Sequence, residues 1–108
     1  MKSYQILIPI KDNFGNTFEQ YIIDLLKRKF LESFTGYTEQ GTYRGAWQNS
    51  SGHIFYDESI SFVVATNNVD QIKNILNEMN IYFKQESYFI SCISNETIIH
   101  SPIGRNYK

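Results

Sequence analysis

The sequence is poor in the residues that usually carry recognisable chemistry. It holds one cysteine, Cys92, with two histidines and two prolines among 108 residues. A lone cysteine cannot form an internal disulfide, and no further ligands stand near it at zinc spacing. We therefore predict no disulfide and no metal site, a reducing compartment, and a Cys92 side chain buried in a strand.

The chain also lacks an excess of charge and any long apolar run. Ten basic and eleven acidic side chains leave a formal net charge of −1. This balance removes the broad attraction that supplies most nonspecific affinity for DNA and RNA, so nucleic acid is disfavoured as a partner. No apolar stretch approaches the roughly 18 residues of a membrane span, and the first residues do not resemble a secretory leader. We expect a cytoplasmic protein with no membrane partner and no cofactor.

What is present fits one small domain. A chain of 108 residues with 42% hydrophobic content is sufficient for a single core. We place this domain at residues 1–96 and interpret residues 97–108 as a C-terminal tail, with a short extra strand at 97–100 as the alternative. The abundance of Ile, Asn and Lys is typical of bacterial or phage genomes rich in A and T.

Apolar spacing predicts four strands and two helices. Short runs rich in β-branched and aromatic residues predict strands at 4–10, 38–48, 54–66 and 88–93. Helical spacing predicts one helix from Phe18 to Phe34, capped by Asn16 or Thr17, and another over 69–83, where Asn68 and Gln71 suggest a capping box.

The order of these elements indicates an α+β fold. Strand, helix, strand, strand, helix, strand is the order of the ferredoxin-like split βαβ arrangement, a four-stranded antiparallel sheet with two helices on one face. The strands then lie in the order fourth, first, third, second. One end of the sheet collects a set of polar residues, namely Lys11, Asp12, Glu58, Ser59, Gln85, Glu86 and Ser87.

Several of these motifs resemble a family of small bacterial proteins known as a domain of unknown function. The likeness covers about residues 30–93 and rests on residues 34–38 (FTGYT), 45–47 (GAW), Gly52, 57–59 (DES) and 83–87 (FKQES). The resemblance implies a ferredoxin-like fold and implies no activity.

The polar end of the sheet supports two interpretations. Glu58 and Glu86 form a carboxylate pair there that shares a proton or holds a cation, or they are exposed acids paired with Lys11 and Lys84. No Gly-x-Ser-x-Gly motif surrounds a serine, and neither histidine has a carboxylate at catalytic spacing. The motifs therefore predict no catalytic residue.

The aromatic residues also support two interpretations. One interpretation is a stacking wall for a flat ligand, made by Trp47 with Tyr37, Tyr43, Phe55 and Tyr56 and with Arg44 beside it. The other is that these aromatic side chains pack against the core on one face and a second subunit on the other. The strands carry more apolar side chains than one face under two helices should absorb, counting Tyr4, Ile6, Ile8, Tyr43, Phe62 and Tyr88. We therefore predict a homodimer formed through the uncovered side or an edge of the sheet.

Together these features favour a nonenzymatic, oligomeric binding module. We expect it to hold a small ligand such as a nucleotide, or a protein partner, with Lys11, Tyr43, Arg44, Trp47, Glu58, Gln85 and Glu86 as candidate site residues. For a phage-encoded protein, sequestering a host signal or inhibiting a host protein fits this prediction. The alternative is a small dimeric enzyme with Glu58 or Glu86 as general base, and a third option is a structural or inhibitory protein that works through its exposed sheet.

Overall fold

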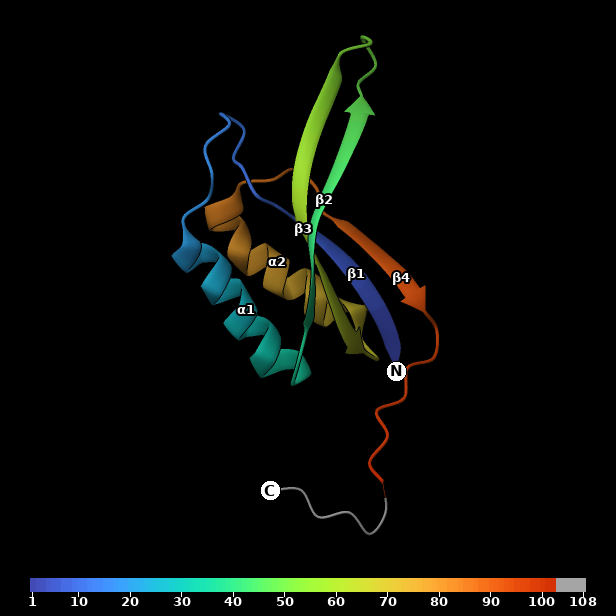
Figure 1. The fold of residues 1–108 in the computed structure, drawn as a ribbon. Coiled ribbons are helices and arrows are strands. Elements are labelled where there is room, and N and C mark those ends of the chain that lie inside the picture. Colours follow the sequence, from blue (N-terminus) through green and yellow to red (C-terminus); the bar gives the residue numbers. More distant parts are fainter. Residues whose placement is uncertain (103–108) are drawn as a thin grey trace.

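A computed structural model describes residues 1–102 of the chain. Figure 1 shows two helices side by side against one sheet. The elements follow in the predicted order: β1 (Lys2–Pro9), α1 (Gln20–Phe34), β2 (Thr38–Gln48), β3 (Ile54–Thr66), α2 (Val69–Phe83) and β4 (Phe89–Ser94).

The sheet has the predicted topology. Its four strands lie in the order β2-β3-β1-β4, and each neighbouring pair is antiparallel. Both helices lie on one face. The α+β, ferredoxin-like prediction is confirmed.

The first helix begins later than its apolar spacing predicts. The helix starts at Gln20, and its cap is Glu19, whose side chain makes no capping hydrogen bond. The predicted caps lie instead in a loop over residues 10–19, in which Thr17 pairs with Lys11 and the Phe18 N–H donates to the Ile10 carbonyl at 3.0 Å. The loop thus uses the residues that looked like a helix start.

The second helix begins where predicted but forms only half of the capping box. The Asn68 side chain accepts a hydrogen bond from the Asp70 N–H at 3.0 Å. The Gln71 side chain does not return to the cap, because its Oε1 accepts from the Thr66 hydroxyl at 2.7 Å.

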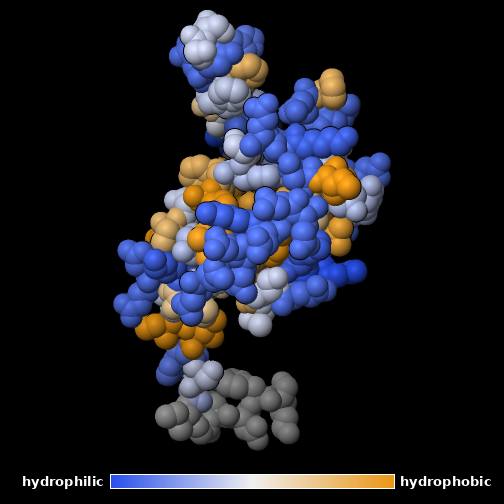
Figure 2. All heavy atoms as spheres, turned by 180° about the vertical axis from the view of Figure 1, so that it is seen from behind, coloured by the Kyte–Doolittle hydropathy of each residue, from blue (hydrophilic) through white to orange (hydrophobic). Residues whose placement is uncertain are grey.

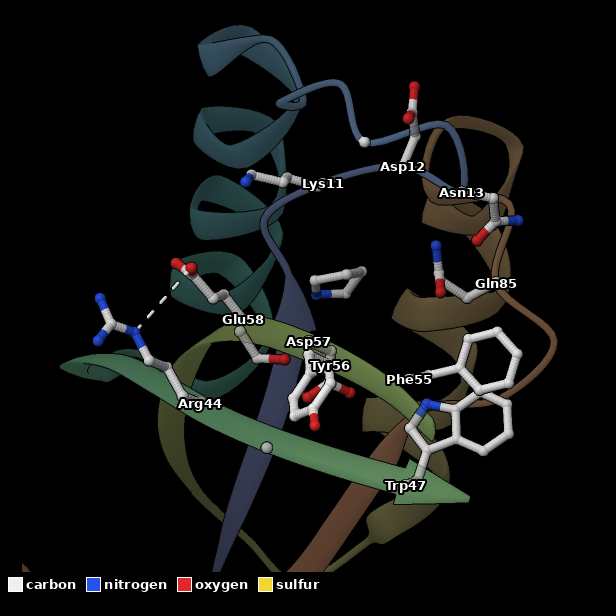
Figure 3. A pocket seen from close by; sticks show the side chains of 14 residues that line it. Lys11, Asp12, Asn13, Arg44, Trp47, Phe55, Tyr56, Asp57, Glu58 and Gln85 are labelled. Carbon is white, nitrogen blue, oxygen red and sulfur yellow. Dashed lines mark ion pairs between the residues drawn. The ribbon is translucent and has the colours of Figure 1, made fainter. Parts of the chain in front are cut away.

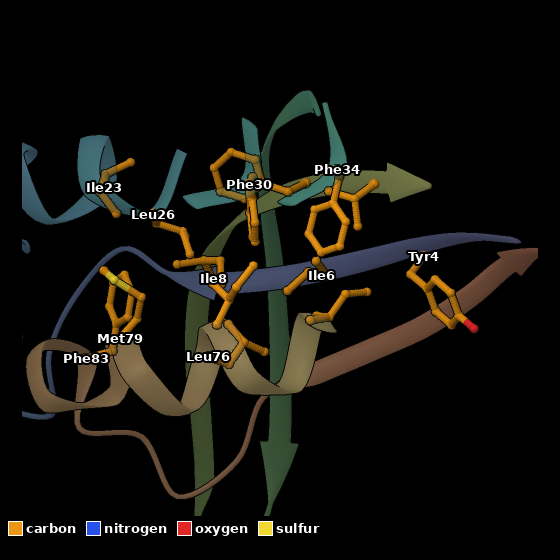
Figure 4. Close-up of a cluster of buried hydrophobic side chains, with 14 of the residues drawn as sticks. Tyr4, Ile6, Ile8, Ile23, Leu26, Phe30, Phe34, Leu76, Met79 and Phe83 are labelled. Carbon is orange, nitrogen blue, oxygen red and sulfur yellow. The ribbon is translucent and has the colours of Figure 1, made fainter. Parts of the chain in front are cut away.

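The core lies between the sheet and the two helices (Figure 4). Ile6, Ile8 and Phe62 are fully buried there, and Tyr4 is nearly so. This corrects the idea that the helices cannot cover these side chains: they belong to the covered face. The other members of the core are Ile22, Ile23, Leu26, Phe30, Phe34, Val64, Ile72, Ile75, Leu76, Met79 and Phe83.

The outer face of the sheet is partly polar. There the Gln5 amide donates to the Ser61 hydroxyl at 3.0 Å, and this hydroxyl donates to Gln40 Oε1 at 2.8 Å. Ser61 is fully buried beneath these amides, so its polar atom is both covered and satisfied.

Two expectations about the C-terminal part are changed. Cys92 is exposed rather than buried, because β4 is an edge strand. Thr97 exchanges backbone hydrogen bonds with Met1, at 2.6 and 3.2 Å, but residues 97–100 form no strand. The rest of the predicted tail, 103–108, lies outside the described residues.

Within residues 1–102, no helix is long and apolar enough to cross a membrane.

Replacement of Phe62 should test the core. Its ring is fully buried and lies edge-on to those of Phe30 and Tyr37, with centroids 5.4 and 5.8 Å away. We expect Phe62→Ala to lower the free energy of unfolding by about 3–5 kcal/mol, because it leaves a cavity. Urea denaturation measures this loss. Phe14→Ala is the control, since Phe14 is 90% exposed and should change stability by less than about 0.5 kcal/mol. Equal effects of the two variants would contradict the described core.

Candidate functional site

A cleft lies where the β2–β3 hairpin extends past the rest of the sheet. The last β1–β3 pair is Pro9 with Ser59, whereas β3 begins at Ile54. The hairpin therefore projects beyond β1, as Figure 1 shows. An open cleft of about 780 Å³ forms between this hairpin, the loop after β1 and the segment that precedes β4. Its lining is Pro9, Lys11, Asp12, Asn13, Gly15, Arg44, Gly45, Trp47, Phe55, Tyr56, Asp57, Glu58, Ser59 and Gln85.

The structure brings most of the predicted site residues together. Five of them line the cleft, namely Lys11, Arg44, Trp47, Glu58 and Gln85. Tyr43 lies in an adjoining groove of about 390 Å³, which shares Arg44, Trp47 and Gln85 with the cleft. Glu86 lines neither space. The predicted pair of Glu58 with Glu86 is therefore not assembled.

An aromatic wall closes one end of the cleft. The rings of Trp47 and Phe55 are stacked, with centroids 4.3 Å apart and an angle of 15° between their planes. The His53 ring packs edge-on against the Phe55 ring, with centroids 4.4 Å apart. Trp47 is 54% exposed, so it retains surface for a further flat group. Figure 3 shows this wall on the opposite side of the cleft from Arg44 and Glu58.

The charged side chains of the cleft are unevenly paired. Arg44 Nε lies 4.0 Å from Glu58 Oε1, at the limit of an ion pair, and both side chains are substantially exposed. Asp57 lies between this pair and the aromatic wall (Figure 3). Across residues 1–102, no hydrogen bond or ion pair engages the Asp57 carboxylate. No group of three or more His, Cys, Asp or Glu side chains in that part of the chain is arranged to hold a metal ion.

One edge of β3 is open to the cleft. The Ile10 N–H donates to the Glu58 carbonyl at 3.1 Å, which marks the edge that faces β1. Because alternate residues of a strand present backbone groups to the same edge, the Tyr56 N–H and C=O point this way too. No strand lies beside Tyr56 on that side. Its backbone is available to hydrogen-bond a ligand.

The loop after β1 is held by Asp12. Its carboxylate accepts hydrogen bonds from the backbone N–H groups of Phe14 and Asn16, each at 2.9 Å. These bonds, above all the one from Asn16, lower the pKa of Asp12 below its ordinary value of 3.8. Gly15 adopts a φ of 84° at the turn. The loop thus presents Lys11 and Asn13 to the cleft.

Gln85 is positioned by a hydrogen-bond network around Asn80. The Asn80 side chain accepts from the Gln85 N–H at 2.9 Å and donates to its carbonyl at 3.1 Å. The Tyr88 hydroxyl also donates to Asn80 Oδ1 at 2.5 Å. Burial raises the pKa of Tyr88 to about 12. One amide therefore fixes the turn between α2 and β4.

Sequence reasoning missed several residues of the cleft. Asn13 and Asp57 were not among the candidates, although Asp57 stands in a motif that we singled out, whereas Phe55 and Tyr56 were expected only as part of the stacking wall. Phe55 and Asp57 lie on the same face of β3. Across the strands they pair with Trp47 and Gly45 of β2. That cross-strand alternation was the available signal.

Comparison with solved structures places the fold near an enzyme. A phage SAM lyase in complex with S-methyl-5'-thioadenosine matches with a TM-score of 0.54 and 16% identity, over 82% of this chain and 77% of that one. A phage SAM lyase in the apo state matches with a TM-score of 0.58 and 15% identity, over 82% and 76%. At these identities the likeness shows the fold alone. No family model and no curated protein matches the chain.

These matches correct the main functional prediction. Sequence analysis favours a nonenzymatic binding module, but the two solved structures described above are of an enzyme. The alternative, a small enzyme that uses a carboxylate, agrees better with them. The resemblance to a domain of unknown function stays a prediction.

Tyr88 should make the protein sensitive to alkali. Because its pKa is raised from 10.0 to about 12, the unfolded state ionises first. The stabilisation is complete below the unfolded pKa and is lost as the pH rises through about 12. Urea midpoints measured at about pH 9 and about pH 11 should fall more steeply for the wild type than for Tyr88→Phe. The two proteins differ at this residue alone, so parallel changes with pH would contradict the burial of this phenol.

Proposed function

We propose that this protein is a small enzyme that cleaves a carbon–sulfur bond of S-adenosylmethionine (SAM) in the cleft beside the β2–β3 hairpin. One observation carries the proposal. In a chain with the fold of a SAM lyase, stacked aromatic rings and the carboxylates of Asp57 and Glu58 line the same cleft.

The chemistry of the cleft suits such a molecule. SAM carries a flat adenine ring at one end and a positively charged sulfonium near its middle. Exposed Trp47 offers a surface on which adenine stacks. Asp57 and Glu58 supply negative charge nearby, which favours a bound cation. Neither feature depends on sequence identity with the lyase.

The reaction requires little machinery. The bond between sulfur and the carbon of the amino-acid chain breaks, and its electron pair goes to sulfur. The sulfonium thereby becomes neutral S-methyl-5'-thioadenosine. As this bond breaks, the neighbouring carbon gives up a proton and a C=C bond forms, or the carboxylate of the same chain forms a C–O bond to the carbon that leaves sulfur. Glu58 is the base in the first route. The second route needs no base, and there Glu58 helps to bind and orient the cationic substrate.

The remaining residues of the cleft have binding roles in this proposal. Lys11 and Arg44 attract the carboxylate of the amino-acid chain, which is the anionic end of the substrate. The Gln85 amide nitrogen donates to the Phe83 carbonyl at 2.8 Å, and its amide oxygen is offered to the substrate from the opposite wall. The open edge at Tyr56 provides further donors and acceptors.

Replacement of Glu58 tests the reaction. We expect Glu58→Gln to lower the release of S-methyl-5'-thioadenosine from SAM by about a hundredfold, since it removes the carboxylate but keeps the side chain's shape. Chromatography of the reaction mixture measures the product and identifies the carbon fragment, which separates the two routes.

Glu86→Gln is the matched control, because Glu86 lines neither the cleft nor the adjoining groove. It should keep wild-type activity. If the purified wild type releases no S-methyl-5'-thioadenosine from SAM, the proposal is wrong. Equal losses in both variants would argue against a specific role for Glu58.

We also propose the homodimer, now with only Tyr43 kept from the side chains on which the sequence prediction was based. Tyr43, Trp47 and Phe89 are 43%, 54% and 54% exposed, and Tyr43 and Phe89 line the adjoining groove on the outer face of the sheet. On the side of the molecule that Figure 2 shows, hydrophobic side chains lie in separate groups among hydrophilic ones. A second copy placed on the outer face would bury the exposed rings of Tyr43 and Phe89.

Native mass spectrometry at micromolar concentration tests this proposal. We expect twice the chain mass for the wild type and a shift toward monomer in Tyr43→Ala, which removes an exposed ring from the outer face. Phe14→Ala is the control, because Phe14 is exposed on the loop after β1, away from that face. A wild-type monomer would refute the dimer.

A further inference from the structure

We propose that Asp57 is the residue with which the cleft distinguishes a positively charged sulfonium from a neutral thioether, and that Gly45 makes room for its carboxylate. This inference rests on the proposed function, because it concerns how the same cleft selects an adenosyl sulfonium.

The geometry begins with a close approach between two paired strands. Gly45 of β2 lies opposite Asp57 of β3. A Cβ atom added to Gly45 would lie 2.9 Å from Asp57 Oδ1 and 4.0 Å from its Cγ. The carboxylate therefore folds over the backbone of β2, into space that any other residue would fill.

Gly45 differs in this respect from the other described glycines. Gly15, Gly36 and Gly41 have no atom within 4 Å of an added Cβ, and at Gly52 the nearest is a side-chain nitrogen at 3.6 Å. Gly45 also has no left-handed φ that would require glycine. The structural reason for glycine at this position is the space that the Asp57 carboxylate occupies.

The charge of Asp57 is not used within the described residues. The nearest cation of the hairpin, Arg44, pairs with Glu58, and no donor among residues 1–102 contacts the Asp57 carboxylate. An exposed carboxylate held over a strand, without a partner, is available to a cationic ligand.

Its position matches the layout of an adenosyl sulfonium. The pair Gly45–Asp57 and the pair Trp47–Phe55 are neighbouring pairs on the same face of the hairpin. The two pairs are spaced two residues apart along each strand, which corresponds to about 7 Å. In an adenosyl sulfonium, a ribose and one methylene group separate the adenine from the sulfur. An adenine stacked on Trp47 would therefore bring the sulfur close to Asp57.

The adjoining groove receives the rest of the molecule. Asp57 lines both the cleft and that groove, so it stands where the two meet. Trp47 also lines both spaces, so a ligand stacked on it can extend into the groove beside this carboxylate.

Two probes isolate the charge. S-Methyl-5'-thioadenosine is neutral, and its S-methylated form carries a sulfonium on the same skeleton. Neither has the amino-acid chain, so the proposed cleavage cannot consume them. Calorimetric titration of the wild type should show tighter binding of the sulfonium by about fivefold, as expected for an exposed ion pair.

Two substitutions should remove that preference. In Asp57→Asn, the affinity for the sulfonium should fall to that for the neutral probe, whose own affinity should change by less than about twofold. Gly45→Ala should act in the same way, because its methyl group displaces the carboxylate. Gly36→Ala is the matched control and should keep the wild-type preference, since an added Cβ meets nothing there.

The outcomes separate this inference from the proposed function. If the wild type binds neither probe, the adenosyl site itself is wrong. If the preference survives in Asp57→Asn, or if Glu58→Gln removes it instead, Asp57 does not read the charge while the site still stands. Should Gly45→Ala fail to fold, Asp57→Asn carries the test alone, because the amide keeps the shape of the side chain.

Discussion

The unequal lengths of the strands are the constraint on which the candidate site depends. Proline cannot donate a backbone hydrogen bond, and β1 ends at Pro9, opposite Ser59. β3 has begun several residues earlier at Ile54, so its first part pairs with β2 alone. This overhang leaves one strand edge open and places a two-stranded ribbon beside the loop after β1. A sheet with strands of equal length would have a flat end there, without the cleft.

The topology could be predicted from the sequence because it follows from local patterns. Alternation of apolar residues identified the strands, and their order with two amphipathic helices left few possible arrangements. The sequence did not predict how many apolar side chains the covered face of the sheet can bury. Ile6, Ile8 and Phe62 seemed in excess for one face, yet the helices supply enough apolar surface to bury all three completely. Cys92 shows the opposite error, since its strand lies at the edge of the sheet. Burial depends on packing between elements, which periodicity does not measure.

The site was predictable to the extent that topology fixes it. Lys11, Glu58 and Gln85 meet because the ends of their elements share one end of the sheet, as the strand order requires. Side-chain direction was harder to predict, because neighbouring residues of an extended chain point to opposite sides. Glu86 follows Gln85 directly and lies outside the cleft, since the hydrogen bonds of Asn80 fix the backbone at this turn. A short polar motif does not indicate which of its side chains such hydrogen bonds will direct into the cleft.

The overhang also separates the residues that stabilise the fold from those of the candidate site. The core beneath the helices is formed by residues of the sheet body and of both helices, whereas the hairpin residues around Asp57 are exposed. A two-stranded ribbon is marginally stable by itself, and it twists more freely than a wide sheet. The position of Asp57 and Trp47 relative to Lys11 and Gln85 therefore depends on few contacts. A ligand that touches both walls would add contacts between the ribbon and the body of the domain, so binding and ordering of the hairpin are coupled. In the proposed site, clearance at Gly45 would matter for the same reason, because a Cβ atom there would lie 2.9 Å from Asp57 Oδ1.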